Sequence, residues 1–517
     1  MATAPGVSVV VNAASSSPRQ NPPTSTWLVT GVASGPSGVA VPINSVQDFQ
    51  TYFGRIVNNS LTGRYTGQGT SSLLDSTLLY DALDVYFREG GINAFVSNTV
   101  SSTAVKATGS AGLTTLTAFG GGTWANSSSG TGSAGLVLSI TLVASSQYIA
   151  QITYNGNIMA TSPVLGGDAD IRNWINSLPA YVGLAAATTA GSVTNALPSS
   201  GTTKYYFTGG TDVAVVDADY TTALTFFTDV YGPGQVSAPG ITTSAVYAAL
   251  TTHAAAFNRV ALLDGANTAT AATLTAAVIT LQSAVTDASY AAMFAPWIIV
   301  PGISNINPGN TTSLVFNRTV APSALAAANM AQTDIGNDCN VPAAGLLHGS
   351  SAYAINVSQT YNATDRASLN AGGVNVIRNV PNVNQIVIYG FRSCAFDPAW
   401  QFFNNVRFRM QVIRDFDIIG ESYTFAEIDG KGQIFSKLQG ALAGQCQSYW
   451  IRKSIYGANA GDAFTVNCGP QINTPATIAA GQINAQVNLR MSPFGELVTI
   501  NVTKYSITSA LPNYNNQ

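Results

Sequence analysis

Charged side chains are scarce in this chain. They account for 9% of its 517 residues, whereas an ordinary soluble domain has about 25%. A surface with so few charges is either solvated by hydroxyl and amide groups or covered by further copies of the same chain, and composition alone favours neither. Hydrophobic residues make up 46% of the chain, which is enough for large cores and argues against disorder of the whole chain.

Basic residues are not in excess, and long apolar segments are absent. The formal net charge is −3 and the pI is about 5.4, so a nucleic-acid partner, which needs clustered lysine and arginine, is not expected. The most apolar run, residues 291–303, is too short to span a bilayer and contains Pro296 and Pro301. The first residues lack the basic segment of an export signal. We therefore expect a soluble protein that is made without export and is not inserted in a membrane.

Cysteine is also rare. No two of the four cysteines have the C-x-x-C spacing of a zinc site, so we expect free and mostly buried thiols in a reducing compartment. These cysteines are Cys339, Cys394, Cys446 and Cys468.

Residues suited to catalysis are few. The two histidines, His253 and His348, belong to no His-Glu-x-x-His motif. The stretch Gly430-Lys431-Gly432 lacks the spacing of a phosphate-binding loop. Asp334 and Asp338 lie four residues apart and support a cation site only weakly, because carboxylates at that spacing usually form a solvated helix face. We therefore expect no enzyme, no cofactor and no metal.

The patterns of helix, strand and turn signals divide the chain into five regions. They predict an α+β multidomain protein in which a mixed α/β domain carries an inserted β-sandwich or small barrel and is followed by a C-terminal α+β domain. The insertion is inferred from its β-branched runs and from the absence of any charged residue between Lys106 and Asp168. The expected regions are an N-terminal arm at 1–23, the α/β domain at 24–98 and 212–385, the insertion at 99–211, the C-terminal domain at 386–505 and a C-terminal arm at 506–517.

The N-terminal arm contains a short valine-rich strand. Val7, Val9, Val10 and Val11 have high β propensity, but no hairpin partner lies nearby in the sequence. Because a single strand is unstable alone, it must pair with a distant sheet edge or with another chain. The alternative is a frayed terminus.

Several short motifs occur in the second half of the chain in a characteristic order. They are Asn370-Ala371-Gly372-Gly373, Tyr389-Gly390-Phe391-Arg392-Ser393, Asn405-Val406-Arg407-Phe408-Arg409, Asn473-Thr474-Pro475 and Pro493-Phe494-Gly495-Glu496. In this order they resemble the C-terminal domain of contractile tail sheath proteins. The helix that ends in Glu89-Gly90-Gly91 is similar to a pattern of the same family, and so is the Gly122–Asn126 stretch of the insertion. The resemblance covers residues 5–98 and 212–503, with a weaker trace through the insertion.

The resemblance implies a mechanical function without covalent chemistry. Sheath subunits assemble as stacked hexameric rings or a multi-start helix around an inner tail tube, and their arms add strands to the C-terminal domains of neighbouring subunits. Contraction from a metastable extended state drives the tube through the host envelope for genome ejection. The implied partners are further copies of the chain, the inner tube protein, and baseplate and tail terminator proteins. The implied location is the virion tail, assembled in the host cytoplasm, with the insertion facing outward and the C-terminal domain near the tube.

Three arginines of the C-terminal domain are candidate contact residues. A helix is expected over 400–415, and Arg407 and Arg414 lie on one side of it, with Arg409 close by. One interpretation is contact with a neighbouring subunit or with the inner tube. The other is pairing within the chain with one of three nearby acids, Asp415, Asp417 or Glu421.

Two other structural classes remain open. A surface-layer or capsid-type protein shares the low charge and the abundance of glycine and threonine. A carbohydrate-binding or carbohydrate-degrading tail protein would suit a β-rich insertion, although residues 107–167 contain no acid that could form a catalytic carboxylate pair. Sheets or shells, as opposed to hollow cylinders, would distinguish the first of these from a sheath.

Overall fold

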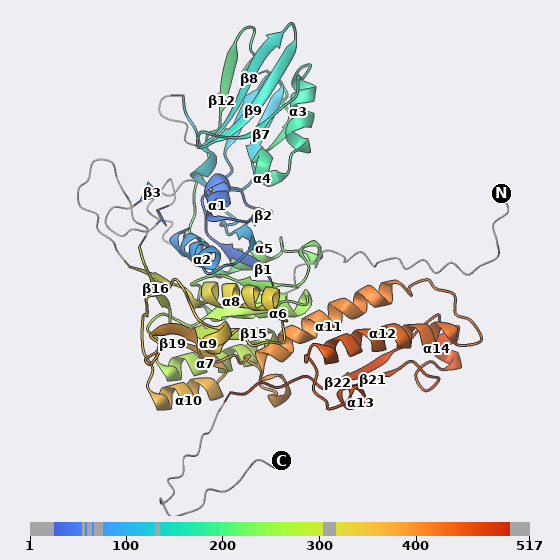
Figure 1. Ribbon diagram of the computed structural model, residues 1–517. Coiled ribbons are helices and arrows are strands. Elements are labelled where there is room, and N and C mark those ends of the chain that lie inside the picture. Colours follow the sequence, from blue (N-terminus) through green and yellow to red (C-terminus); the bar gives the residue numbers. More distant parts are fainter. Residues whose placement is uncertain are drawn as a thin grey trace, which may run out of the picture.

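The computed structural model describes residues 25–53, 57–58, 65–66, 76–129, 135–193, 195–302 and 317–496. The expected strand at Val7–Val11 and the C-terminal arm lie outside these residues. The described chain forms three parts: a central α/β body, a β-rich insertion above it, and a C-terminal lobe that extends to one side (Figure 1).

An eight-stranded sheet with the order β2-β5-β1-β13-β14-β15-β19-β20 forms the centre of the body. The six inner strands run parallel, and the two edge strands pair antiparallel to their neighbours. Most residues of the inner strands are buried, because helices cover both faces of the sheet. The strands are β1 Thr26–Gly31, β2 Ala40–Ile43, β5 Asn93–Asn98, β13 Gln235–Ser237, β14 Val260–Asp264, β15 Ala291–Ala295, β19 Val374–Val380 and β20 Gln385–Ile388.

Helices cover the two faces of this sheet and enclose two cores. On one face α1, α2 and α8 contribute to a core with Trp27 and Phe49, and on the other α5, α6, α7 and α10 surround Phe227 and Leu250. The helices are α1 Val46–Phe53, α2 Ser76–Arg88, α5 Asp217–Leu224, α6 Ser244–Ala256, α7 Ala271–Ala284, α8 Pro322–Gly336, α9 Gly345–His348 and α10 Ala363–Ala371. The remaining strands and 3₁₀ turns of the body are β3 Val57–Asn58, β4 Tyr65–Thr66, β16 Ile298–Val300, β17 Arg318–Val320, β18 Asn356–Val357, η2 Asp229–Tyr231 and η3 Ala288–Tyr290.

The insertion consists of two antiparallel sheets, β10-β9-β8-β12 and β11-β7-β6, with one shared core. Trp124 packs against Tyr154 in this core, with ring centroids 5.5 Å apart. The turn between β9 and β10 is Asn155-Gly156 with φ of 47° and 82°, as a tight hairpin requires. The elements are β6 Thr108–Ala111, β7 Thr114–Ala118, η1 Thr123–Ala125, β8 Leu136–Ala144, β9 Gln147–Tyr154, β10 Asn157–Thr161, α3 Asp168–Ser177, α4 Ala180–Gly183, β11 Ala185–Thr189 and β12 Thr202–Tyr206.

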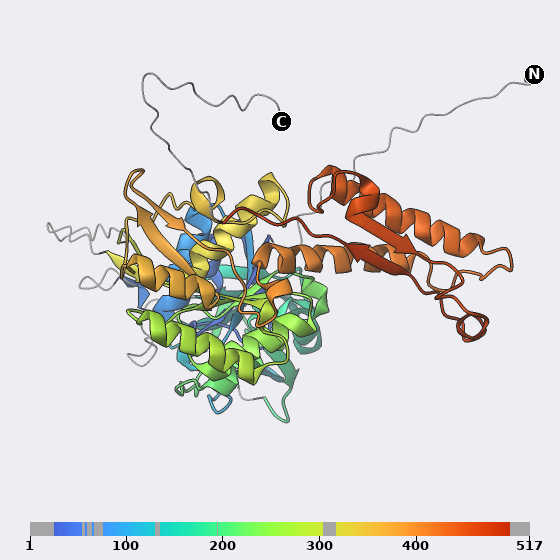
Figure 2. The same cartoon turned by 90° about the horizontal axis from the view of Figure 1, so that it is seen from below.

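The C-terminal lobe is built on two long helices that project from the body (Figures 1 and 2). The helices pack on each other through Phe408 and Tyr449, whose rings are 5.1 Å apart. A two-stranded antiparallel sheet packs beside α12. The elements are η4 Pro398–Trp400, α11 Phe403–Glu421, α12 Gln433–Ile451, α13 Ala460–Ala463, β21 Phe464–Asn467, α14 Pro475–Ala479 and β22 Gln486–Leu489.

The structure corrects the start of the C-terminal domain. The apolar run Ile386–Tyr389 predicts a strand as the first element of that domain. This strand is β20, which pairs with β19 at the edge of the central sheet, so that Ile388 lies opposite Ile377. The sequence shows the strand but not its partner, because an apolar run carries no information about which edge it joins. The lobe therefore begins after the central sheet is complete.

Candidate assembly surface

The two-stranded sheet of the lobe offers open edges. In the part of the chain that the structure describes, β21 and β22 pair with each other along four residues, from Phe464 opposite Leu489 to Asn467 opposite Gln486, and neither belongs to a larger sheet. Val466 and Val487 pack toward α12 and hold the sheet in place. Unpaired backbone N–H and C=O groups along such an edge can receive a strand from another chain.

Arg407 ties the base of the lobe to the body. Its side chain is fully buried on α11 and forms an ion pair with Asp334 of α8, which is also fully buried. Burial raises the pKa of Asp334 to about 6 against the opposing effect of Arg407. The partner is thus none of the three acids expected, and Arg407 presents no surface to another subunit.

Arg409, two residues after Arg407 on α11, lies against two aromatic rings. Its guanidinium carbon is 4.1 Å from the ring centroid of Tyr290 and 4.3 Å from that of Trp400. The same guanidinium donates a hydrogen bond of 3.1 Å to Ser289 and lies 3.7 Å from Asp287. Arg414, half-buried, lies farther out along α11.

A second connection joins the C-terminal end of α12 to the body. Asp338 accepts a hydrogen bond of 3.0 Å from the Ser454 hydroxyl and pairs with Arg452 at 2.9 Å. Asp334 and Asp338, the weak cation candidates, therefore bind separate arginines. No group of three His, Cys, Asp or Glu side chains that could hold a metal occurs among the described residues.

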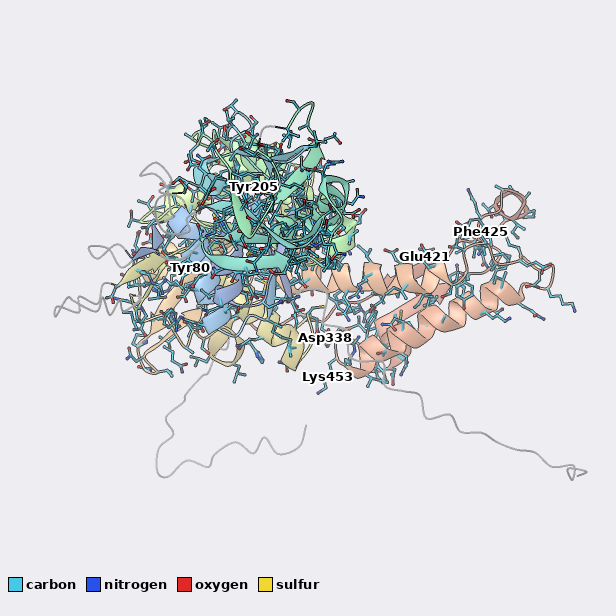
Figure 3. All side chains as sticks on the ribbon, turned by 90° about the horizontal axis from the view of Figure 1, so that it is seen from above. Tyr80, Tyr205, Asp338, Glu421, Phe425 and Lys453 are labelled. Carbon is cyan, nitrogen blue, oxygen red and sulfur yellow. The ribbon has the colours of Figure 1, made fainter. Side chains whose placement is uncertain are left out.

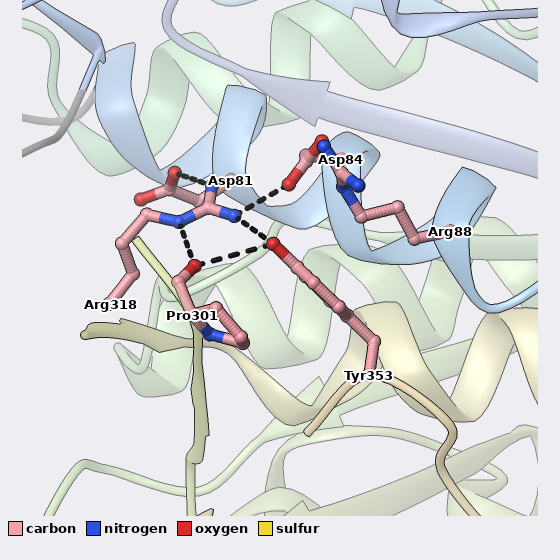
Figure 4. Close-up of polar contacts among 6 residues, drawn as sticks. All are labelled: Asp81, Asp84, Arg88, Pro301, Arg318 and Tyr353. Atoms are coloured by element: carbon pink, nitrogen blue, oxygen red, sulfur yellow. Dashed lines mark hydrogen bonds and ion pairs between the residues drawn. The ribbon is translucent and has the colours of Figure 1, made fainter. Parts of the chain in front are cut away.

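A buried arginine inside the body was not identified from the sequence. Arg318 of β17 donates to Asp81 at 2.7 Å and to Asp84 at 2.6 Å, and also to the hydroxyl of Tyr353 and the carbonyl of Pro301 (Figure 4). Burial lowers the pKa of Arg318, but the two aspartates outweigh this effect and the net shift is upward. Two acids three residues apart on an otherwise apolar helix are the sequence signal that could have pointed to a buried cation.

The Glu-Gly-Gly motif at the end of α2 has a structural explanation. The buried carboxylate of Glu89 accepts hydrogen bonds of 2.9 Å from the backbone N–H groups of Ala352 and Tyr353, and a further bond from Ser351. Gly90 adopts a φ of 90°, and a Cβ there would lie 1.8 Å from the amide nitrogen of Gln332. The motif therefore fixes the 351–353 loop against α2.

Two of the family-like motifs meet at the end of the described chain. Arg392 pairs with Glu496 through bonds of 2.9 and 2.5 Å, and Phe402 stacks on Phe494 with centroids 4.9 Å apart. A groove of about 730 Å³, called the α9 groove below, lies beside this pair. Its lining includes Leu346, Leu347, His348, Tyr389, Phe494 and Glu496.

The two histidines lie in different surroundings, since His348 borders the α9 groove and His253 is on α6. His253 is buried and lies 2.7 Å from the Arg259 guanidinium, and burial, followed by the Arg259 charge, lowers its pKa to about 4. It is therefore neutral at pH 7. All four cysteines are buried free thiols. No helix of the described chain is long and apolar enough to cross a membrane.

Comparison with known proteins shows similarity in structure. No family model matches the sequence, and no curated protein matches it. A chain of the anti-feeding prophage baseplate, solved with six-fold symmetry, is 18% identical and superposes with a TM-score of 0.53 over 98% of this chain and 100% of that one. A sheath tail protein of Listeria innocua is 15% identical with a TM-score of 0.53 over 86% and 89% of the two chains. This chain has the fold of contractile sheath proteins. The same sheath fold occurs in the contracted sheath of the extracellular injection system PVC, with 15% identity and a TM-score of 0.50 over 97% and 98%.

Proposed function

We propose that this chain is the sheath subunit of a contractile tail or injection system, which polymerises around an inner tube and contracts to drive that tube through a cell envelope. The observation that carries the proposal is that the sheath fold extends over the whole chain and not over the α/β body alone. An α/β body by itself serves many functions. Because the superposition covers 98% of this chain, it includes the projecting lobe and the insertion as well.

Strand exchange between copies connects the subunits in this proposal. The valine strand of the N-terminal arm and the C-terminal arm pair with the open edges of β21 and β22 in neighbouring subunits. The open edges on a projecting lobe support this step, because such edges are otherwise exposed to uncontrolled pairing. Since arm and edge are different surfaces, each copy can join a further copy, and such contacts build rings or helices of many subunits.

Contraction requires no bound nucleotide in this mechanism. Burial of apolar surface yields about 25 cal/mol per Å², so a few hundred Å² more in the contracted lattice releases several kcal/mol per subunit before opposing terms. Summed over many subunits, this energy moves the tube. The extended sheath is then a kinetically trapped state.

The lobe is the part that we place against the tube, and the insertion faces outward. Of the three candidate arginines, Arg409 and Arg414 retain surface for contact with a neighbouring subunit or with the tube, whereas Arg407 is enclosed. The further partners of this proposal are the inner tube, baseplate and terminator proteins. In a phage the location would be the virion tail and the result genome ejection.

Electron microscopy of the purified protein tests the proposal. We expect negatively stained hollow cylinders from the full chain. Deletion of Met1–Arg19, or of the residues after Tyr505, should leave a folded subunit with an unchanged circular dichroism spectrum that forms no cylinders. Flat sheets or closed shells from the full chain would contradict the sheath function, and normal cylinders from either truncation would contradict the role of the arms.

A further inference from the structure

The outer end of the C-terminal lobe carries an exposed aromatic side chain. We call residues 417–432 the lobe tip. They comprise the last residues of α11 and the turn that leads to α12. Phe425 in this tip is fully exposed and has a φ of 62°. A left-handed backbone is rare for a bulky residue and costs about 1–3 kcal/mol, and such strain concentrates at functional sites. Figure 3 places Phe425 at the far end of the lobe.

The lobe tip is also acidic. Four carboxylates and one lysine lie in residues 417–432, so the segment has a net charge of −3. Glu421 and Glu427 are exposed. Asp429 accepts hydrogen bonds from the backbone N–H groups at the start of α12, which hold the turn in its shape. The tip is thus a fixed structure that presents one aromatic ring among negative charges.

The α9 groove has complementary properties on the body. Its rim exposes 87% of Leu347 and 51% of Tyr389. Arg366 lies in the groove wall, and Arg378 stacks on Tyr389 at 4.2 Å. Neither arginine belongs to an ion pair among the described residues, while the acid of the groove, Glu496, is matched by Arg392. The groove therefore combines apolar surface with unmatched positive charge.

A chain cannot fill its own groove with its own tip. The tip is at the outer end of the lobe, whereas α9, α10 and β19 belong to the body, and both views show them at opposite ends of the molecule (Figures 1 and 2). We propose that Phe425 of one subunit inserts into the α9 groove of a second copy, with the acidic tip facing Arg366 and Arg378. This inference rests on the proposed assembly function and names a contact within it. Because tip and groove are different surfaces, the contact propagates.

A matched pair of phenylalanine substitutions tests the contact. We expect Phe425→Ser to raise the protein concentration needed for cylinder formation at least tenfold, because a buried aromatic anchor dominates such an interface. Phe396, 85% exposed in the segment between β20 and η4 and far from the lobe tip in the sequence, provides the control, and Phe396→Ser should leave that concentration unchanged. Both variants should keep the circular dichroism spectrum of the parent chain.

Thiol crosslinking locates the partner surface. A chain with Phe425→Cys and Leu347→Cys should give a ladder of covalent oligomers with a short thiol crosslinker, whereas Phe425→Cys combined with Val230→Cys, a site 90% exposed on the body, should not. The native cysteines are buried and do not compete.

If the parent chain forms cylinders but Phe425→Ser assembles as Phe396→Ser does, or if no ladder forms in those cylinders, the inference fails while the sheath function stands. If Phe425→Ser impairs cylinder formation only when an inner tube protein is added, the tip contacts the tube and the inference is overturned. If the parent chain forms no cylinders, the proposed function fails first.

Discussion

Asp264 and His253 show how the burial of single residues sets the response of this fold to pH. Asp264 is fully buried at the end of β14, where it accepts hydrogen bonds from the backbone of Gly240 and from both the backbone and the hydroxyl of Ser323. Burial raises its pKa to about 6, although these hydrogen bonds oppose the shift. His253 is shifted in the other direction, to about 4, by burial and by Arg259. The two residues should therefore affect stability with opposite sign.

The opposite signs lead to a prediction at the residue scale. Between about pH 4 and 6 the unfolded chain has released the Asp264 proton that the folded chain keeps, so this residue makes the free energy of unfolding fall as pH rises. Over about pH 4 to 6.5 the unfolded chain binds a proton at His253 that the folded chain does not bind. His253 therefore makes the free energy of unfolding rise as pH rises. Each effect is about 3 kcal/mol. Urea unfolding from pH 4 to 7 should show a wild-type minus Asp264→Asn difference that decreases with pH and a wild-type minus His253→Gln difference that increases. Differences of the same sign would contradict this account.

At the scale of elements, the helix α12 shows what local sequence can and cannot predict. The sequence predicts a helix over 433–443 that ends before Gly444. The helix does begin at Gln433, but it continues to Ile451. Glycine disfavours a helix by about 1 kcal/mol. Burial of Cys446 and Tyr449 against α11 and the lobe sheet outweighs that cost. Tertiary packing, which the sequence window does not contain, decided the end of the helix.

Gly444 and a second glycine of the same helix, Gly440, give a prediction for α12. Gly440 and Gly444 are exposed, and a Cβ at either position would meet no atom within 4 Å. Alanine there should stabilise the lobe by about 0.5–1 kcal/mol at each site, because the unfolded chain loses conformational freedom without strain in the folded state. The measurement is the urea midpoint followed by circular dichroism. Gly90→Ala is the control and should destabilise, since Gly90 has a positive φ and no space. A lower midpoint for the α12 variants would mean that the helix does not tolerate the change.

At the scale of the molecule, the order of motifs identified the sheath fold correctly, but the contacts that assemble it were not predictable. The pairing of Arg407 with Asp334 and the cluster around Arg318 join residues 73 and more than 230 positions apart. Such distant partners leave no trace in local periodicity. The valine arm remains a prediction, because it lies outside the described residues. The boundary at residue 386 failed for a related reason, since strand partners are set by the whole sheet.

The insertion provides the last prediction, because it has its own core and the chain enters and leaves it at one place. The chain enters and leaves it side by side, with bridges between Val105 and Thr211 and between Thr108 and Thr208. Replacement of residues 109–207 by a short Gly-Ser linker should therefore leave a body that unfolds cooperatively in urea. Since we place the insertion on the outside, the variant should form cylinders of smaller outer diameter and unchanged inner diameter in negative stain. A reduced inner diameter, or a folded variant that no longer assembles, would show that the insertion takes part in the contacts between subunits.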